Sequence, residues 1–393
     1  MSRALPIALA LALASPLGAQ DTTPPAPAPA APAAPRRTVE FTGFALLNAF
    51  YNTARVNNSD VPQLAANDTV SISGGGGSIR QTRLGVFVTD PDVLGGSFTG
   101  EIDVDFFGGQ AASSGGRTFP VARLRRAVGT VNWTHAQLLI GQETPLVASR
   151  EPRSLASIGF PDFAAAGNLW LWIPQARFTL EAGYTLRLAL QAAVLAPTAG
   201  TPQGPLFTQP DSAERTGRPY LQGRIRLGWG PTDDASEIAF GAHQGWLRGL
   251  DSLTGDSLLT SQALTADARI KIGEMEVLGE AFVGKALAGL GGGGIGQNFG
   301  LNGEQIRTRG GWGQMNLRLR QSVLVGWGCG LDDPDDADVP LTGTFRNFVC
   351  ELHTQWRPAG PMVFAFEYRR LQTTYQQGDV TATHLNLAAG FRF

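Results

Sequence analysis

The last residues of this 393-residue chain, Thr381–Phe393, constrain its fold more than any other stretch. Apolar and small side chains occupy one parity (Leu385, Leu387, Ala389, Phe391, Phe393), and mostly polar or small ones occupy the other (His384, Asn386, Ala388, Gly390, Arg392). Successive side chains of a strand point to opposite faces, so this segment has one apolar face and one polar face. It also exceeds the roughly 9–11 residues with which a tilted strand crosses a bilayer. The pattern predicts a barrel strand, with the edge of a soluble β-sandwich as the alternative.

The same alternation recurs along the chain and predicts an all-β protein. Sixteen candidate strands run from Val39–Tyr51 to Thr381–Phe393. Their connections alternate between short turns such as Gly273–Met275 and long links such as Glu143–Asn168. An even strand number with this segregation of loop lengths is typical of outer-membrane barrels and has no counterpart in a sandwich. The terminal aromatic Phe393 also resembles the assembly signal that ends the closing strand of such barrels. We therefore expect a transmembrane antiparallel β-barrel of about 16 strands.

The N-terminal region predicts export. Residues 1–20 read as a signal peptide, with Arg3 before the short apolar run Ala4–Ala14. That run is too short to span a bilayer as a helix, which takes about 20 residues. Residues 21–37 form a Pro/Ala-rich linker whose prolines forbid helix and sheet and favour an extended tether, with a cell-wall contact as the alternative. Residues 38–393 are left for the barrel.

Arginine dominates the positive charge of the chain. Of 31 basic residues only Lys271 and Lys285 are lysines, although the formal net charge is −2. Arginine is the residue that captures carboxylates and phosphates through paired hydrogen bonds. The net charge therefore does not indicate which ions the protein attracts. Which arginines face the lumen is more informative.

The polar parity of the strands defines the expected lumen. Its basic members are Arg83, Arg123, Arg125, Arg177, Arg187, Arg224, Arg226, Arg269, Lys271, Arg318, Arg320 and Arg369. Its acidic members are Glu101, Asp103, Asp105, Asp267, Glu280, Glu351 and Glu367. Two roles are open for Arg83, Arg123 and Arg125. They contact a solute, or they pair with Glu101, Asp103 and Asp105, the acidic ladder on the third candidate strand. The better candidates for anion capture are arginines on other strands, where fewer acidic neighbours are expected: Arg187, Arg224, Arg226, Arg318 and Arg320.

The third long link, Glu143–Asn168, has unusual composition for a loop in water. It contains Arg150 and Arg153 together with many apolar residues. Folding into the lumen would bury those apolar groups and narrow the pore, as constriction loops do. The alternative is an extracellular cap at a subunit contact.

Strand register brings the two cysteines together. If the thirteenth and fourteenth candidate strands pair with Trp327 opposite Leu352, then Cys329 falls opposite Cys350. Opposed residues of an antiparallel pair lie within disulfide distance, and export to an oxidising compartment permits the bond. The alternative is two unpaired thiols.

Other functional classes find little support. The four histidines, His135, His243, His353 and His384, lie on separate strands without a nucleophile motif beside them, so we expect no enzyme. Neither a metal nor a cofactor is predicted, since zinc-cluster and nucleotide-binding spacings do not occur. The tetraglycine runs Gly74–Gly77 and Gly291–Gly294 are interpreted as flexible loop tips. The acidic segment Asp332–Asp338 keeps a structural barrel or surface adhesin open as the alternative function.

Four motifs, in order, resemble one family. They are FTGFALLNAFYN (Phe41–Asn52), RLRRA (Arg123–Ala127), LLIGQET (Leu138–Thr144) and IPQARF (Ile173–Phe178). Together they are similar to the DcaP-like porins, trimeric 16-stranded outer-membrane channels associated with dicarboxylate uptake. The resemblance implies a homotrimer in the lipid of a Gram-negative outer membrane. It also implies passive diffusion of small solutes, with a preference for organic anions such as dicarboxylates, and no nucleic-acid partner.

The chain departs from the family pattern in two places. Leu46 and Asn48 stand where the first strand of the family often carries a charged pair. The Pro/Ala-rich linker replaces the N-terminal coiled coil of the family. The first departure bears on the choice of solute, and the second on any trimerisation unit in the periplasm.

Overall fold

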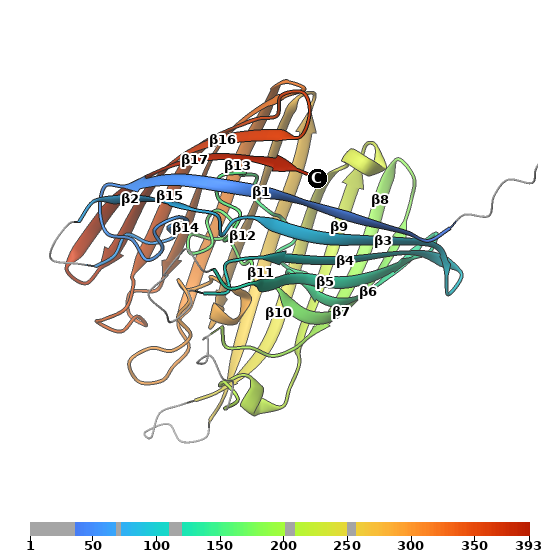
Figure 1. Ribbon diagram of the computed structural model, residues 1–393. Coiled ribbons are helices and arrows are strands. Elements are labelled where there is room, and N and C mark those ends of the chain that lie inside the picture. The colour runs from blue at the N-terminus through green and yellow to red at the C-terminus, as the bar shows by residue number, and fades with distance from the viewer. Residues whose placement is uncertain (1–35, 68–71, 110–119, 201–208, 250–256) are drawn as a thin grey trace, which may run out of the picture. The chain divides into compact units, whose positions relative to one another are not determined.

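The computed structural model describes residues 36–67, 72–109, 120–200, 209–249 and 257–393. Arg37–Phe393 form one compact unit, a closed antiparallel sheet (Figure 1). The expected signal peptide and all but the last two residues of the expected linker lie outside the described residues. Nowhere in those ranges is there a helix long and apolar enough to cross a membrane.

Seventeen strand segments form the wall. They are β1 (Thr38–Asn52), β2 (Gly74–Ser78), β3 (Arg83–Val93), β4 (Gly96–Asp105), β5 (Arg123–Asn132), β6 (Ala136–Glu143), β7 (Ile173–Ala182), β8 (Leu186–Leu195), β9 (Tyr220–Trp229), β10 (Ser236–Arg248), β11 (Leu258–Ile272), β12 (Met275–Lys285), β13 (Arg307–Arg320), β14 (Val323–Pro334), β15 (Arg346–Trp356), β16 (Met362–Tyr375) and β17 (Gly378–Arg392). Both β2 and β3 pair antiparallel with β1, β2 along its second half and β3 along its first. They are one strand interrupted at residues 79–82, so the barrel has sixteen positions, as the sequence predicted.

The first and last strands close the barrel. β1 pairs with β17 from Phe44 opposite Arg392 to Asn52 opposite His384. The main-chain groups of Gly43 and Phe393 also exchange hydrogen bonds, of 3.2 and 3.1 Å. Because every strand has two neighbours, the sheet has no open edge, which is the condition for crossing a bilayer as strands.

Side chains alternate as the terminal strand predicted. On β17 Leu387 is 60% exposed on the outer face, whereas His384 and Asn386 are fully buried inside. The same holds on β10, where Phe240 is 66% exposed outside and His243 faces inward at 4%. A wall with apolar side chains outside and polar ones inside inverts the pattern of a soluble protein and requires lipid around it.

Loop lengths define the two ends of the barrel. At one end of the barrel, the turns have two to six residues. They join β3 to β4, β5 to β6 and so on to β15 and β16, and examples are 273–274 and 321–322. Most links at the other end are long, including 144–172, 196–219 and 286–306. Short turns face the periplasm in outer-membrane barrels and long loops face outward, which orients this chain.

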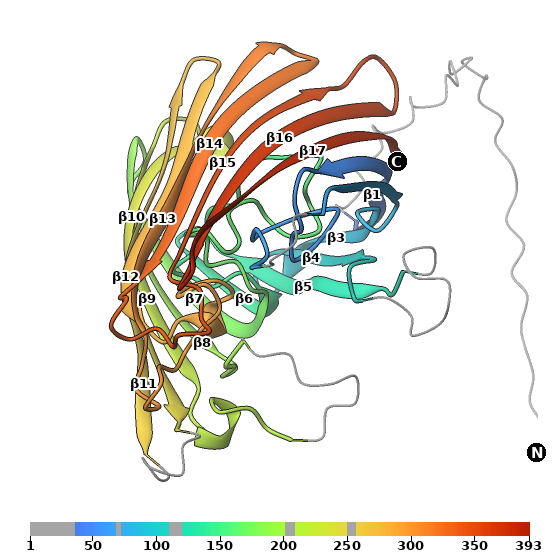
Figure 2. The same ribbon diagram turned by 90° about the vertical axis from the view of Figure 1, so that its left-hand side faces the viewer.

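The long segment 144–172 between β6 and β7, here called the interior loop, folds into the barrel (Figure 2). Leu146, Val147 and Phe163 are at most 2% exposed within it. Phe163 stacks on Trp312 of β13 at 5.8 Å and has a positive φ of 62°, uncommon for an aromatic residue. The expected constriction loop is therefore present, and the alternative of an extracellular cap is wrong.

Candidate functional site

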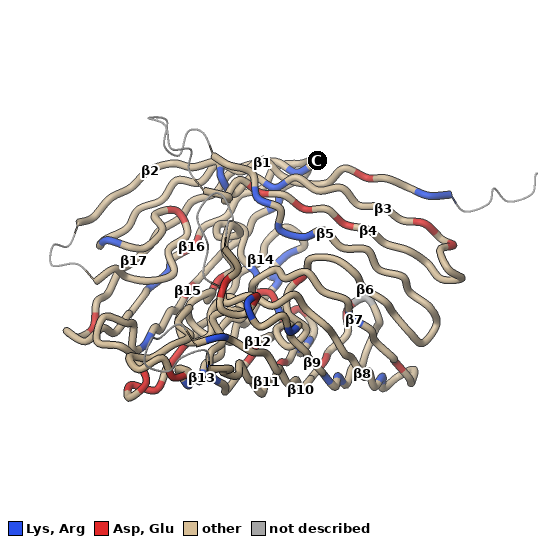
Figure 3. Tube along the Cα trace, turned by 90° about the horizontal axis from the view of Figure 1, so that it is seen from below, with Lys and Arg blue, Asp and Glu red and all other residues tan. Residues whose placement is uncertain are grey.

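Ion pairs on β3, β4 and β5 neutralise the first group of expected lumenal arginines. Arg83 donates to Asp103 at 2.6 Å, and Arg123 donates to Asp105 at 2.6 Å. Arg125 lies 3.4 Å from Asp103 and 3.2 Å from Asp105, with a side chain only 2% exposed. Figure 3 shows acidic positions on β4 beside basic positions on β5. Of the two roles considered for these three arginines, the structure therefore shows pairing with the acidic side chains of β4.

A β-bulge adds an arginine that the parity rule missed. The register of β4 against β5 shifts directly after Asp103. A bulge inserts one residue and re-aims the side chains beside it, so Arg126 turns inward next to Arg125. Arg126 donates to Glu101 at 2.9 Å and to Glu143 at 2.9 Å. Two successive arginines in the run R-L-R-R were the only sequence signal for this bulge.

The prediction that Arg187, Arg224 and Arg226 have few acidic neighbours is wrong. The Arg224 guanidinium donates to both carboxylate oxygens of Asp267, at 2.8 and 2.7 Å, and both side chains are buried. Arg226 pairs with Glu181 and lies 3.2 Å from Glu237. Arg187 lies 3.9 Å from Glu181. Glu181 of β7 and Glu237 of β10 face inward, and the sequence analysis did not assign them to the lumen.

Further pairs complete the neutralised part of the interior. Arg269 donates to Glu276 at 2.6 Å and to Asp234 at 2.5 Å, and Lys271 lies 3.3 Å from Asp234. Arg369 binds Asp162 of the interior loop and lies 2.8 Å from Glu367. Arg177 has no carboxylate partner among the described residues, but its guanidinium donates to Thr144 O at 2.8 Å.

The interior loop is fastened by its arginines and by its main chain. Arg150 donates to Asp267 at 2.7 Å and to Glu237 at 2.6 Å. Arg153 binds Glu276 and keeps 47% of its side chain exposed. Gln81, in the interruption between β2 and β3, accepts from Ile158 N at 2.6 Å and donates to Ala156 O at 2.7 Å. Arg150 is thus a buried anchor of the loop, whereas Arg153 pairs with Glu276 and keeps about half of its side chain exposed to the vestibule.

A cavity of about 790 Å³ lies between the interior loop and the periplasmic turns, and we call it the vestibule. Eight of its lining residues are basic and four are acidic: Arg83, Arg125, Arg150, Arg153, Arg269, Lys271, Arg318 and Arg357 against Glu151, Asp234, Glu274 and Glu276. Most of these arginines already have a carboxylate partner, as described above.

Arg318 and Arg357 are the exceptions in this lining. Neither forms an ion pair in the part of the chain that the structure describes, and Arg357 has only a 3.3 Å contact with the Gln355 amide oxygen. Burial is the largest cause that lowers the pKa of Arg357. The positive charges of Arg392, Arg318 and Arg153 lower it further. Guanidinium groups stay protonated nonetheless, so the vestibule wall holds uncompensated positive charge here.

The remaining candidates take other places. Arg320, the last residue of β13, is exposed and has no ion pair among the described residues; a register shift after Arg318 sets it opposite Val323, and it does not line the vestibule. The carboxylate of Glu280 accepts from Arg150 N at 2.6 Å and from the Trp312 indole at 3.3 Å. Glu351 and Glu367 lie deep in the wall behind the interior loop. Besides Glu181 and Glu237, the sequence analysis missed Arg126 in the lumen and Arg357 and Glu276 in the vestibule lining.

Cys329 of β14 and Cys350 of β15 are directly opposed and joined by a disulfide. The register also places Trp327 opposite Leu352, as the sequence analysis supposed. The pair lies on the outward-facing parity, near the middle of both strands.

Both tetraglycine runs are ordered, so their reading as flexible tips is wrong. Gly74–Ser78 form β2 and pair with β1. Gly294 N and Ile295 N donate to the buried carboxylate of Asp332, at 3.2 and 3.1 Å. Asp332 is therefore a structural acceptor and not part of an external acidic patch.

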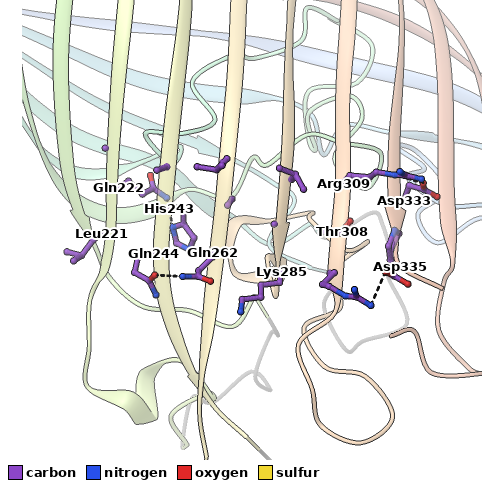
Figure 4. A pocket seen from close by; sticks show the side chains of 18 of the residues that line it. Leu221, Gln222, His243, Gln244, Gln262, Lys285, Thr308, Arg309, Asp333 and Asp335 are labelled. Carbon is purple, nitrogen blue, oxygen red and sulfur yellow. Dashed lines mark hydrogen bonds and ion pairs between the residues drawn. The ribbon is translucent and has the colours of Figure 1, made fainter. Parts of the chain in front are cut away.

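A second cavity, of about 1130 Å³, lies along β9–β14 toward their extracellular ends (Figure 4). Outward-facing side chains such as Leu264 and Val283 line it together with Lys285. Arg309 at its rim pairs with Asp333 at 2.8 Å. This groove faces away from the lumen and is separate from the vestibule.

Comparison with known proteins supports the fold. No protein-family model matches the chain, and no curated protein matches it. Among solved structures, the outer membrane channel DcaP of Acinetobacter baumannii is 18% identical, with a TM-score of 0.69 over 91% of this chain and 98% of that one. An anion-selective porin from Comamonas acidovorans is 14% identical, with a TM-score of 0.58 over 91% and 100%. OmpF of Salmonella typhi, in complex with daunomycin, is 7% identical, with a TM-score of 0.56 over 90% and 97%.

The chain therefore has the fold of the outer-membrane porins of Gram-negative bacteria, and its apolar outer face fits that membrane. At the level of the fold, the resemblance to the DcaP-like porins is confirmed.

Proposed function

We propose that this barrel is a passive outer-membrane channel that prefers small organic anions. The observation that carries the proposal is the pair Arg318 and Arg357, which face the vestibule without a carboxylate partner among the described residues. Positive charge in a narrow, partly low-dielectric passage raises the local concentration of anions and replaces part of their hydration.

The geometry favours weak and repeated contact over tight capture. Arg153 extends from the interior loop toward the same cavity, and Lys271 and Arg269 lie on its wall. Because carboxylates already hold several of these groups, a passing anion competes for them and leaves easily. A channel needs this balance, since tight binding would stop conduction.

Dicarboxylates are the proposed solutes, through the resemblance to the DcaP-like porins. Two carboxylates on a short chain suit two separated guanidinium groups, each able to form paired hydrogen bonds. A homotrimer is proposed on the same basis. One similar structure, OmpT of Vibrio cholerae, is described as a trimer form.

The test is the reversal potential of the refolded protein in planar bilayers under a KCl gradient. An anion-selective potential supports the proposal, and block of the chloride current by added succinate would extend it to dicarboxylates. A cation-selective potential would instead indicate a channel governed by the acidic residues of β4. Complete lack of conductance would favour a structural barrel or adhesin.

A further inference from the structure

Three buried carboxylates meet between the interior loop and the wall. Asp162 belongs to the loop, Glu351 to β15 and Glu367 to β16. One carboxylate oxygen from each lies within 4.8 Å of the other two. The three side chains are at most 1% exposed, so water does not screen them. The channel proposed above makes no use of this cluster.

Glu367 is well provided with partners. Ser154 and Ser157 of the interior loop donate to its two oxygens, at 2.6 and 2.9 Å. Arg369 lies 2.8 Å from it and also binds one oxygen of Asp162. The single guanidinium is therefore shared between two of the three carboxylates.

The other two carboxylates each keep an unpartnered oxygen. Asp162 Oδ2 and Glu351 Oε2 accept no hydrogen bond from any described residue, although both atoms are buried. The second oxygen of Glu351 accepts from Gln314 at 2.5 Å and lies 3.3 Å from His353 Nδ1. Buried polar atoms of native proteins almost always have a partner, so these two oxygens point to a ligand between them.

Charge leads to the same conclusion. If all three carboxylates are ionised, Arg369 is their basic partner among the described residues, and two negative charges remain without compensation. Burial and the charges of Glu351 and Glu367 raise the pKa of Asp162. One divalent cation would bring the cluster to neutrality, and buried charges need such compensation.

We propose that one Ca²⁺ ion binds between Asp162, Glu351 and Glu367 and fastens the interior loop to the barrel wall. The ligands are all carboxylate oxygens, which suit hard cations and not zinc or copper. Ca²⁺ accepts irregular oxygen geometry, whereas Mg²⁺ demands a near-regular octahedron. The rival occupant is a proton shared between Asp162 and Glu351.

Such a site escaped sequence analysis because it has no local motif. Asp162 is about two hundred residues away from Glu351 and Glu367 along the chain, and only the inward folding of the loop joins them. Its consequence would be a cross-link that limits how far the loop, and with it Arg153, can move over the vestibule.

The test uses the full chain refolded in detergent free of lipopolysaccharide and treated with EDTA. Isothermal titration with CaCl₂ should show one site per chain, and mass spectrometry of the dialysed protein should find one calcium. In Glu351→Gln, which keeps the shape of the side chain, we expect affinity to fall at least tenfold. Asp162→Asn should behave alike, and because Asp162 lies outside the strands, that variant keeps the test informative if Glu351→Gln fails to fold.

The matched control is Asp333→Asn/Asp335→Asn, which removes two carboxylates at the extracellular rim and should leave the site intact. Trypsin supplies an independent readout, because release of the loop by EDTA should speed cleavage after Arg153 in the wild type and in the control, but not in Glu351→Gln. Absence of Ca²⁺ binding at millimolar concentration would overturn the proposal in favour of the shared proton. So would binding that the control abolishes and Glu351→Gln leaves unchanged. Neither result bears on whether the barrel conducts anions.

Discussion

Neutralising Arg318 and Arg357 together tests the proposed basis of anion preference. The double substitution Arg318→Gln/Arg357→Gln removes the two vestibule arginines that lack a carboxylate partner among the described residues. Neither change uncovers a buried acid, so the barrel should remain folded. Anion preference should fall, because the positive potential at the periplasmic mouth falls.

The size of the effect follows from the cavity. A sphere of 790 Å³ has a radius of about 6 Å, at which one charge in water acts on another with about 0.7 kcal/mol. Screening over a Debye length of about 10 Å in 0.1 M salt reduces this to about 0.4 kcal/mol. Two charges then contribute about 0.8 kcal/mol for a monoanion and about 1.5 kcal/mol for a dianion. Occupancy of the vestibule should fall about fourfold and about tenfold respectively.

The assay is the reversal potential under a KCl gradient, together with the succinate concentration that halves the chloride current. The control is Arg346→Gln/Arg370→Gln, which removes an equal number of positive charges from the outward-facing wall, at positions that do not line the vestibule. The reasoning is refuted if the double variant keeps the wild-type potential, or if the control lowers it equally. A larger effect at high salt than at low salt would also contradict it.

Three further predictions concern the barrel wall and the link between β14 and β15. Replacing Cys329 and Cys350 by Ser should lower the free energy of unfolding by up to about 3 kcal/mol, given a separation of 21 residues, as urea unfolding in micelles would measure. Arg369→Met leaves buried carboxylates uncompensated and should destabilise the protein by about 3–5 kcal/mol in the same assay. The hydrogen bond from Arg307 is the main cause that lowers the pKa of Asp338, against the opposing effect of burial, so Asp338 stabilises the fold above the ordinary carboxyl range near pH 4. Asp338→Asn should therefore lose a little stability at pH 7, and the deficit should vanish as the pH falls through the lowered native pKa.

Each of these has its own contradictory outcome. Equal unfolding of reduced and oxidised wild type would show that the disulfide contributes nothing. Arg370→Met, on the outward face, is the control for Arg369→Met, and equal loss in the two would remove the argument from buried charge. A deficit of Asp338→Asn that grows toward acidic pH would have the wrong sign.

Much of the barrel was predictable, because its rules are local. The alternation of Leu387 with His384 sets which face meets lipid, and one assumed pair in the hairpin fixes the register of Cys329 and Cys350. Loop lengths are also visible in the sequence, and they orient the barrel. These inferences need only the period of a strand and the geometry of an antiparallel pair.

Charge compensation was less predictable, since it depends on neighbours across strands and on irregularities. A parity count cannot see that a bulge turns Arg126 inward. Nor does it see that Glu181 of β7 reaches Arg226 of β9 across an intervening strand. The ion pair of Arg150 with Asp267 joins positions 117 residues apart, through a loop whose path the sequence leaves open. Anion contacts were therefore assigned to paired arginines, while Arg357, which follows the end of β15, was missed.

The interruption between β2 and β3 has a consequence for how such a channel can change over evolution. Gln81 holds the interior loop through the main chain of Ala156, Ile158 and Gly159, and not through their side chains. The course of the loop at this point is thus independent of which residues occupy it. Substitution of Arg153 would remove its ion pair with Glu276, but the main-chain hydrogen bonds to Gln81 would still hold this part of the loop against the wall. A descendant of this protein can acquire a new solute preference by substitution at a few loop positions, with the barrel unchanged.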